Sequence, residues 1–191
     1  TKSSLLRNFA ESNDLKILSY PQNIEGRFSL FSFMSLFPTV PFIDNAKELK
    51  DAAKWVSQNS GLVKTMSQFY LDSFNENKWI SMFWLYSERL KEFGFWLEQL
   101  WAESLGKSPL DSKRVSTPFC CYGTNDQHSL LQQMEEGFQD KSHLFIQIRE
   151  PNLNAKYNKN WISPEAGYLN QYDLDYIMKL YCQATYQSLQ N

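Results

Sequence analysis

One short run of apolar residues constrains the fold of this chain more than any other feature. The segment from Trp79 to Leu85 is almost continuous in large apolar side chains, and it follows the polar stretch Asn75-Glu76-Asn77-Lys78. A strand covered on both faces has this composition, whereas a strand with one solvated face alternates apolar and polar residues. We therefore predict a buried strand in a parallel sheet.

Two further segments have the composition of strands, His143 to Ile148 and Phe119 to Tyr122. Between the strands, Glu88 to Ala102 and Asn125 to Glu136 carry apolar stripes at helical spacing. Strands that alternate with helices indicate an open α/β sheet with helices on both faces.

The remaining patterns predict elements toward the two ends of the chain. Leu15 to Tyr20 has the composition of a strand, and Asn152 to Asn160 is polar and rich in turn-forming residues. Apolar spacing predicts helices over Ser4 to Asn13, Asn45 to Gln58 and Asp173 to Leu189. In the last of these helices we expect the inward face to carry Ile177, Leu180, Tyr181 and Ala184.

Composition excludes several classes of protein. The 191 residues are 42% hydrophobic, which is enough for one sizeable core, and 19 Lys and Arg against 21 Asp and Glu give no argument for a nucleic-acid partner. No apolar run approaches the roughly 20 residues of a membrane span, so we expect no membrane partner. The start of the chain has no signal-peptide pattern and no initiator Met, which suggests that it begins inside a longer protein.

The cysteines and histidines predict no metal site and no disulfide framework. Cys120, Cys121 and Cys182 are odd in number, and we interpret them as reduced core thiols of a cytoplasmic protein. His128 and His143 are the only histidines, and no CxxC pair accompanies them. Zinc sites need more ligands at closer spacing, so we expect neither a metal nor another cofactor.

Three short segments carry residues suited to chemistry. They are Gly26-Arg27-Phe28-Ser29, Gln99-Leu100-Trp101-Ala102-Glu103-Ser104-Leu105-Gly106-Lys107 and Gly123-Thr124-Asn125-Asp126-Gln127-His128-Ser129. In this order and at these separations they resemble the phosphoglucose isomerase family, and Tyr86 to Phe93 resembles that family's YSDRLKDF segment. The resemblance implies an aldose-ketose isomerase that interconverts glucose 6-phosphate and fructose 6-phosphate without a cofactor. It also implies the three-layer αβα sandwich of a sugar isomerase (SIS) domain around a parallel sheet.

The resemblance further implies how the chain is divided. Residues 1–21 match the end of a first SIS domain, residues 22–41 a connecting segment that carries Arg27, and residues 42–191 a second SIS domain without the family's C-terminal segment. The family's Ser- and Thr-rich phosphate loop and its terminal lysine have no match here. We therefore expect this chain to be part of a longer enzyme and to be inactive alone.

Glu103 is the candidate base. Aldose to ketose isomerisation moves a proton between two adjacent carbons through an enediolate, and one carboxylate can carry that proton. The residue lies at the end of the predicted helix, near the negative pole of the helix dipole, which favours a proton acceptor. By resemblance it is the family's catalytic glutamate. The alternative is a solvated carboxylate at a helix end, which is the usual state of glutamate.

His128 is the second candidate. It falls in the first turn of a predicted helix with Thr124 or Asn125 as N-cap, where the positive end of the dipole disfavours imidazolium. A neutral imidazole can relay the proton that opens the sugar ring, and the family assigns its histidine that role, borrowed from the partner subunit of a homodimer. The alternative is a histidine that satisfies a helix start.

Arg27, Gly26 and Gln99 complete the predicted site. The guanidinium of Arg27, leaving a tight turn after Gly26, would face the developing oxyanion, and the family uses this arginine to stabilise the enediolate. The family's first glycine is replaced by Glu25, so a surface ion pair between Glu25 and Arg27 is the alternative. Gln99 lies one helical turn before Glu103 and, like Gly26, matches a substrate-contacting residue of the family.

A second class of function stays open. A SIS-type module that binds a sugar phosphate or another protein, and has lost catalysis, would keep the same three motifs. The reading frame of the whole protein distinguishes the two hypotheses, because a phosphate loop upstream and a lysine downstream are needed for the enzyme.

Overall fold

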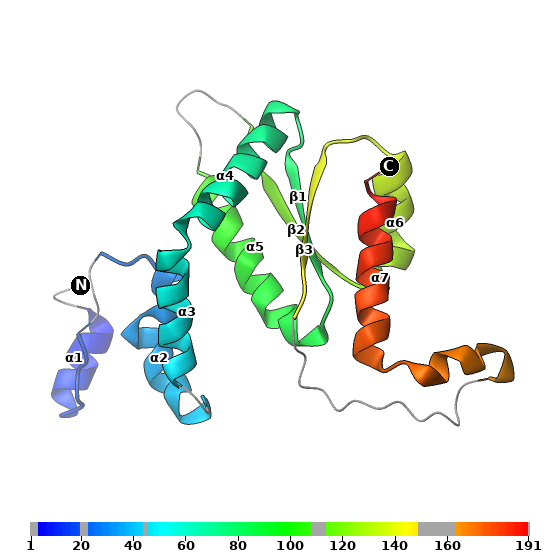
Figure 1. The fold of residues 1–191 in the computed structure, drawn as a ribbon. Helices are drawn as coiled ribbons and strands as arrows, with labels where there is room; N and C mark the ends of the chain where they lie inside the picture. Colours follow the sequence, from blue (N-terminus) through cyan, green and yellow to red (C-terminus); the bar gives the residue numbers. More distant parts are fainter. Residues whose placement is uncertain (1–3, 20–22, 44–45, 108–113, 149–162, 191) are drawn as a thin grey trace. The chain divides into compact units, whose positions relative to one another are not determined.

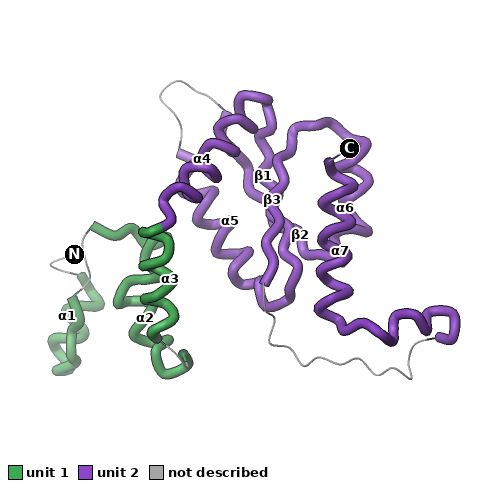
Figure 2. The backbone as a smooth tube through the Cα atoms, in the orientation of Figure 1, with its two compact units in different colours: residues 1–58 green, residues 59–191 purple. Residues whose placement is uncertain are grey.

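The computed structural model describes residues 4–19, 23–43, 46–107, 114–148 and 163–190. The chain forms two compact units, Thr1–Gln58 and Asn59–Asn191, coloured separately in Figure 2. Each unit is described by itself below. The domain boundaries expected from the sequence, at residues 21 and 41, remain predictions.

The second unit is built on a sheet of three parallel strands in the order β2-β1-β3. The central strand β1 (Ile80–Leu85) pairs with β2 (Thr117–Tyr122) on one side and with β3 (Lys141–Ile146) on the other. Every residue of β1 after Ile80 is buried, which confirms the prediction of a strand covered on both faces.

Two layers of helix cover the sheet (Figure 1). The helices α4 (Ser60–Asn75) and α5 (Lys91–Leu105) lie on one face, and α6 (Asn125–Glu136) and α7 (Leu174–Ser188) lie on the other. The predicted three-layer α/β architecture with a parallel sheet is therefore confirmed. Short 3-10 helices at Glu88–Leu90 (η3) and Pro164–Gln171 (η5) precede α5 and α7.

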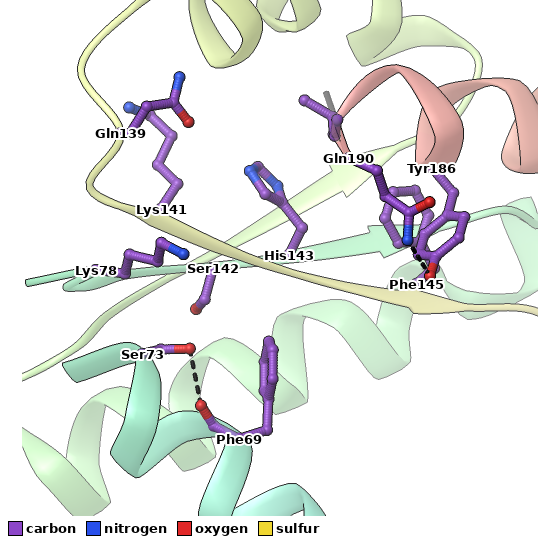
Figure 3. Close-up of a pocket in the computed structure, with 11 residues that line it drawn as sticks. Phe69, Ser73, Lys78, Gln139, Lys141, Ser142, His143, Phe145, Tyr186 and Gln190 are labelled. Atoms are coloured by element: carbon purple, nitrogen blue, oxygen red, sulfur yellow. Dashed lines mark hydrogen bonds between the residues drawn. The ribbon is translucent and has the colours of Figure 1, made fainter. Parts of the chain in front are cut away.

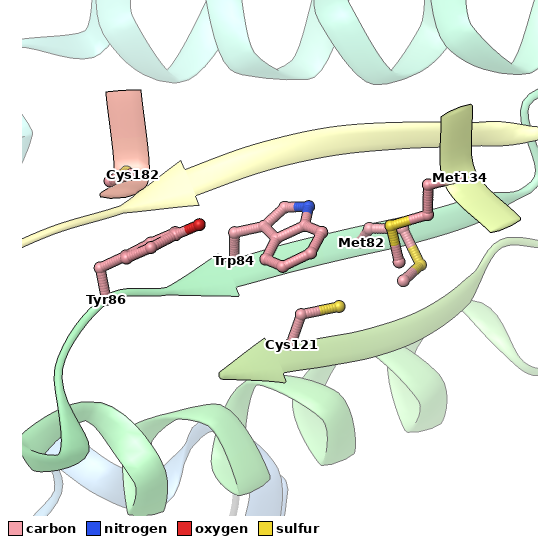
Figure 4. Packing of buried hydrophobic residues seen from close by; sticks show 6 residues of the cluster. All are labelled: Met82, Trp84, Tyr86, Cys121, Met134 and Cys182. Carbon is pink, nitrogen blue, oxygen red and sulfur yellow. The ribbon is translucent and has the colours of Figure 1, made fainter. Parts of the chain in front are cut away.

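Each face of the sheet has its own core because β1 alternates its large side chains between the two faces. Tyr70, Phe83, Leu85 and Cys120 form the core beneath α4 and α5. Figure 4 shows the other core, which lies beneath α6 and α7 and contains Met82, Trp84, Tyr86, Cys121, Met134 and Cys182.

All three cysteines are free and buried, as predicted. Burial, more than the nearby Glu98, raises the pKa of the Cys120 thiol to about 12, so this thiol stays protonated at neutral pH.

The helix α7 turns a different face inward from the one that the sequence predicted. Its buried residues are Cys182 and Thr185, whereas Leu180 and Tyr181 are 43% and 48% exposed. The inward stripe lies one position further along the chain because the small Thr185 is held inside by a hydrogen bond from Tyr86 at 2.7 Å. Apolar spacing alone favours the larger residues and cannot detect such a bond.

The first unit is helical and thinly packed. It contains α1 (Leu5–Ser12), η1 (Gly26–Phe31), α2 (Phe33–Thr39), η2 (Val40–Phe42) and α3 (Ala46–Gln58). Among its described residues only Ser32 is buried, while Leu5 and Phe42 are 90% and 86% exposed. The Ser4 side chain caps α1 by accepting a hydrogen bond from the Arg7 amide at 3.1 Å.

The predicted strand from Leu15 to Tyr20 is wrong over its described part. Leu15 to Ser19 have no regular structure and lie exposed, and Tyr20 lies outside the described residues. Strand composition is realised only where a neighbouring strand offers backbone partners, and the described part of this unit contains none. The polar stretch from Asn152 to Asn160 also lies outside the described residues.

Candidate active site

The candidate base lies inside the last turn of α5 rather than just beyond the helix. Glu103 is exposed, and its Oε1 accepts a hydrogen bond from the Nε2 of Gln99 at 2.8 Å. The helical spacing therefore places both side chains on one face of α5, as expected for residues four apart. An amide donor on one oxygen restricts the rotamers of the exposed carboxylate.

The end of α5 that carries Glu103 is fixed at the amino-terminal end of the strands. Trp101 donates its indole hydrogen to Ser116 Oγ at 3.0 Å, and the Oγ atoms of Ser116 and Ser81 lie 2.7 Å apart. Ser116 immediately precedes β2, and Ser81 is the second residue of β1. Trp101 also packs on Phe83 with ring centroids 5.4 Å apart, which confirms that it belongs to the core.

The second candidate, His128, is exposed in the first turn of α6, and within the described part of the chain its side chain makes no hydrogen bond. Thr124 is the N-cap, but its side chain does not bond the helix start. Asp126 links the helix to the sheet instead, since its Oδ2 accepts a hydrogen bond from the Tyr122 amide at 2.6 Å. Ser129 donates to the other oxygen of the same carboxylate at 3.2 Å.

The residue before this histidine connects α6 to β1 and α7. Gln127 Nε2 donates to Tyr86 Oη at 3.1 Å and also contacts Thr185 Oγ1. The ring of Tyr86 lies directly against Gly123, where a Cβ atom would overlap it, so glycine is required by this close approach. The segment Gly123 to Ser129 thus contains one exposed histidine on a helix start that is bonded to three neighbouring elements, β1, β2 and α7.

The structure separates the two candidates within one chain. Glu103, in the last turn of α5, lies near the amino-terminal ends of β1 and β2, and His128, in the first turn of α6, follows the carboxyl-terminal end of β2. Six residues of strand span roughly 20 Å. These two side chains of a single chain therefore cannot act together on one small molecule.

Arg27 belongs to the first unit, whereas Glu103 and His128 belong to the second. It forms an ion pair with Glu25, and its guanidinium lies 4.7 Å from the centroid of the Phe28 ring. Its side chain is only 13% exposed. The tight turn expected at Gly26 is present, because the Phe28 amide donates to the Glu25 carbonyl oxygen at 2.9 Å where η1 begins. Glycine itself is not required there, since its φ is not positive and a Cβ would meet nothing within 4 Å.

A separate cavity of about 300 Å³ lies beside β3 (Figure 3). It is lined by His143, Lys141, Lys78, Phe145, Tyr186 and neighbouring residues of α4 and α7, and none of them belongs to the three motifs. Burial, with smaller effects of Lys141 and Lys78, lowers the pKa of His143 to about 4, so this imidazole is neutral at physiological pH. Its Nδ1 accepts a hydrogen bond from Trp84 Nε1 at 3.3 Å.

The described residues offer little else that could hold a cofactor. No three His, Cys, Asp or Glu side chains gather there as a metal site would require. None of the described helices is long and apolar enough to cross a membrane.

Sequence reasoning missed Tyr86 and Thr185, which fix the start of α6, because 99 residues separate them and no local pattern joins them.

Comparisons with known proteins agree on one family. The glucose-6-phosphate isomerase of Methanocaldococcus jannaschii is 33% identical, over 86% of this chain and 42% of that enzyme. The glucose-6-phosphate isomerases of Rubrobacter xylanophilus and Campylobacter jejuni are 32% and 29% identical, each over 98% of this chain. The chain spans less than half the length of the curated relatives that it matches. No family model matches it.

A solved structure supports the fold. The crystal structure of a hypothetical protein from Thermus thermophilus superimposes with a TM-score of 0.83 and 28% identity, over 97% of this chain and 46% of that one. The similarity therefore extends through both compact units.

Proposed function

Because this chain is homologous to the glucose-6-phosphate isomerases over almost all of its length, we propose that the full-length protein containing it interconverts glucose 6-phosphate and fructose 6-phosphate. In this reaction the carboxylate of Glu103 takes the proton from C2 of the open-chain aldose. The resulting enediolate accepts the proton back at C1, while a proton also moves from O2 to O1, and the product is the ketose. No cofactor enters this scheme.

One observation carries the proposal: Glu103 is exposed and held by Gln99 through a 2.8 Å hydrogen bond. A base must present a fixed oxygen to the substrate carbon, and an oriented side chain on a helix does so with little loss of entropy on binding. Gln99 is thus a substrate-facing partner of the base, as the family resemblance implies, and Gly26 is assigned to the substrate pocket by the same resemblance. Arg27 is assigned to the oxyanion by the same resemblance.

The test is the Glu103→Gln variant of the full-length enzyme. We expect kcat to fall by at least about 1000-fold while KM changes little, because the amide keeps the shape of the side chain and removes only proton transfer. A coupled assay with fructose 6-phosphate measures both constants. Glu92→Gln, an exposed residue in the first turn of the same helix, is the matched control. Near-normal turnover of Glu103→Gln would exclude this residue as the base.

We also propose a homodimer in which each site combines Glu103 of one subunit with His128 of the other. The separation of these residues at opposite ends of the strands supports the sharing, since one chain alone cannot bring them together. His128 would then relay the proton that opens the sugar ring.

The free, buried cysteines suit a reducing compartment, and we place the enzyme in the cytoplasm. We expect the isolated 191-residue chain to be inactive.

Subunit mixing tests the shared site. Glu103→Gln and His128→Ala full-length enzymes, each with only a small residual activity, are combined under conditions that exchange subunits. In a mixed dimer one shared site carries both substitutions and the other carries neither, so activity should reappear, reaching about half of the wild-type value per mixed dimer. If mass spectrometry finds the mixed dimers but no activity returns, both residues act from the same chain.

A further inference from the structure

Three side chains join the start of α6 to the rest of the second unit, and their bonding leads directly to His128. We propose that Tyr86, Gln127 and Thr185 are positioning residues that set the direction of His128 in the proposed reaction. The inference rests on the proposed role of His128, and it assigns the function of residues that do not themselves touch the substrate. We call these three residues the α6 clamp.

Every hydrogen of the clamp has a defined acceptor. Tyr86 Oη donates to Thr185 Oγ1 at 2.7 Å, and Thr185 Oγ1 donates to the Tyr181 carbonyl oxygen at 3.0 Å. Gln127 Nε2 lies 3.1 Å from Tyr86 Oη and 3.3 Å from the same Tyr181 oxygen. That carbonyl only accepts hydrogen bonds, so the amide nitrogen of Gln127, not its oxygen, must face it.

Burial makes the clamp rigid. Tyr86 and Thr185 are 6% and 2% exposed, so water does not compete for their hydroxyl groups. A buried hydrogen bond that loses one partner leaves the other unsatisfied, which makes alternative side-chain positions costly. Gln127 therefore cannot move away without leaving Tyr86 Oη short of a donor, although Thr185 Oγ1 would still accept from Tyr86.

The clamp acts on His128 through the backbone of the first turn of α6. The two residues before the histidine are both held by hydrogen bonds. The Asp126 carboxylate accepts from the Tyr122 amide, and the Gln127 amide donates to Tyr86 and to α7. With these two residues fixed, the Cα–Cβ direction of His128 is also fixed, although its own ring is free of hydrogen bonds within the described residues. A small rotation of this turn would carry the imidazole away from a substrate bound by the other subunit.

The experiment uses two substitutions at Thr185 in the full-length enzyme, with kcat and KM measured for fructose 6-phosphate. Thr185→Val keeps the shape and removes the hydroxyl, whereas Thr185→Ser keeps the hydroxyl and removes a methyl group. If hydrogen bonding positions His128, kcat should fall about 10-fold in Thr185→Val with KM within about twofold, and Thr185→Ser should stay within about twofold of wild type. A role in packing alone predicts the reverse order. Equal activity of both variants and wild type overturns the proposal.

A double-mutant cycle separates the clamp from the proposed function. In a His128→Ala background, Thr185→Val should cause no further loss, because its effect passes through the missing imidazole. Additive losses overturn the positioning role while leaving the function of His128 intact. Full activity of His128→Ala alone would instead remove the proposed role of the histidine, and the clamp proposal with it.

Tyr86→Phe provides a second variant with the same expectation. Tyr122→Phe is its matched control, because the Tyr122 hydroxyl contacts the Lys91 carbonyl oxygen and not α6.

Discussion

His128 stands exposed on a firmly bonded helix start, whereas His143 is half-buried beside the cavity at β3 and is itself held by a hydrogen bond from Trp84. At the first position the surroundings are fixed and the imidazole is free. At the second the imidazole is half-buried, and this burial lowers its pKa to about 4. The contrast teaches that the setting, and not the residue type, decides which histidine side chain is accessible to a substrate.

Gly123→Val should have the largest effect, because it disturbs the start of α6, which carries His128. The new side chain would overlap the Tyr86 ring, which is buried and cannot retreat without disturbing the core beneath α6 and α7. We expect the free energy of unfolding to fall by about 3 kcal/mol, together with a loss of isomerase activity. Urea denaturation measures the first effect. Gly61→Val is the control, since a Cβ at that glycine in α4 meets nothing within 4 Å. Equal stability of the two variants would mean that Tyr86 does not press on this helix start.

The surroundings of His143 predict that the stability of the fold depends on pH. Folded His143 has a pKa of about 4, below the ordinary value of about 6.5 in the unfolded chain, so between these values the unfolded chain binds more protons. The contribution of His143 is present above about pH 6.5 and is lost as the pH falls toward 4, by roughly 3 kcal/mol in total.

The difference between wild type and His143→Gln isolates this contribution from the carboxylates that titrate nearby. Denaturation curves between pH 4 and 7 provide the measurement, and the stabilities of the two proteins should diverge progressively as the pH falls below about 6.5. Parallel curves would show that His143 is as accessible to protons as an exposed histidine.

Trp84→Phe should give the smallest of the three effects, and it tests the hydrogen bond that His143 accepts. The substitution removes the indole hydrogen that His143 Nδ1 accepts at 3.3 Å, and it leaves a small gap in the core beneath α6 and α7. We expect a loss of about 1–2 kcal/mol by thermal or chemical unfolding. Trp96→Phe on the half-buried side of α5 is the comparison, and a loss as large there would point to ring volume rather than to the bond with His143.

The sequence predicted most elements of the second unit because their signals are local. The apolar run before Tyr86 indicated β1, and the spacing from Asn125 to Glu136 gave the bounds of α6 without error. It did not indicate α4, although Tyr70 and Phe74, one turn apart, both face the sheet. The apolar side chains of this helix are spread around it, so no clear stripe marks the inward face.

The candidate residues were predicted from motifs, and their arrangement was not. Nothing in the order of the segments indicates that Glu103 and His128 lie at opposite ends of the strands, because that follows from α5 running back along β1. The bonds among Tyr86, Gln127 and Thr185 join three elements that are distant in sequence. Contacts of this kind depend on the final packing and leave no periodic trace in one sequence.

The position of β1 has a further consequence for how the second unit comes apart. This strand supplies backbone partners to both neighbours and side chains to both cores, so neither helical layer can detach without exposing a face of the same strand. Its amide hydrogens should therefore exchange with deuterium only through global opening, at a rate set by the full stability of the unit. Amides of the thinly packed first unit, with its single buried side chain among the described residues, should exchange through small local fluctuations long before them.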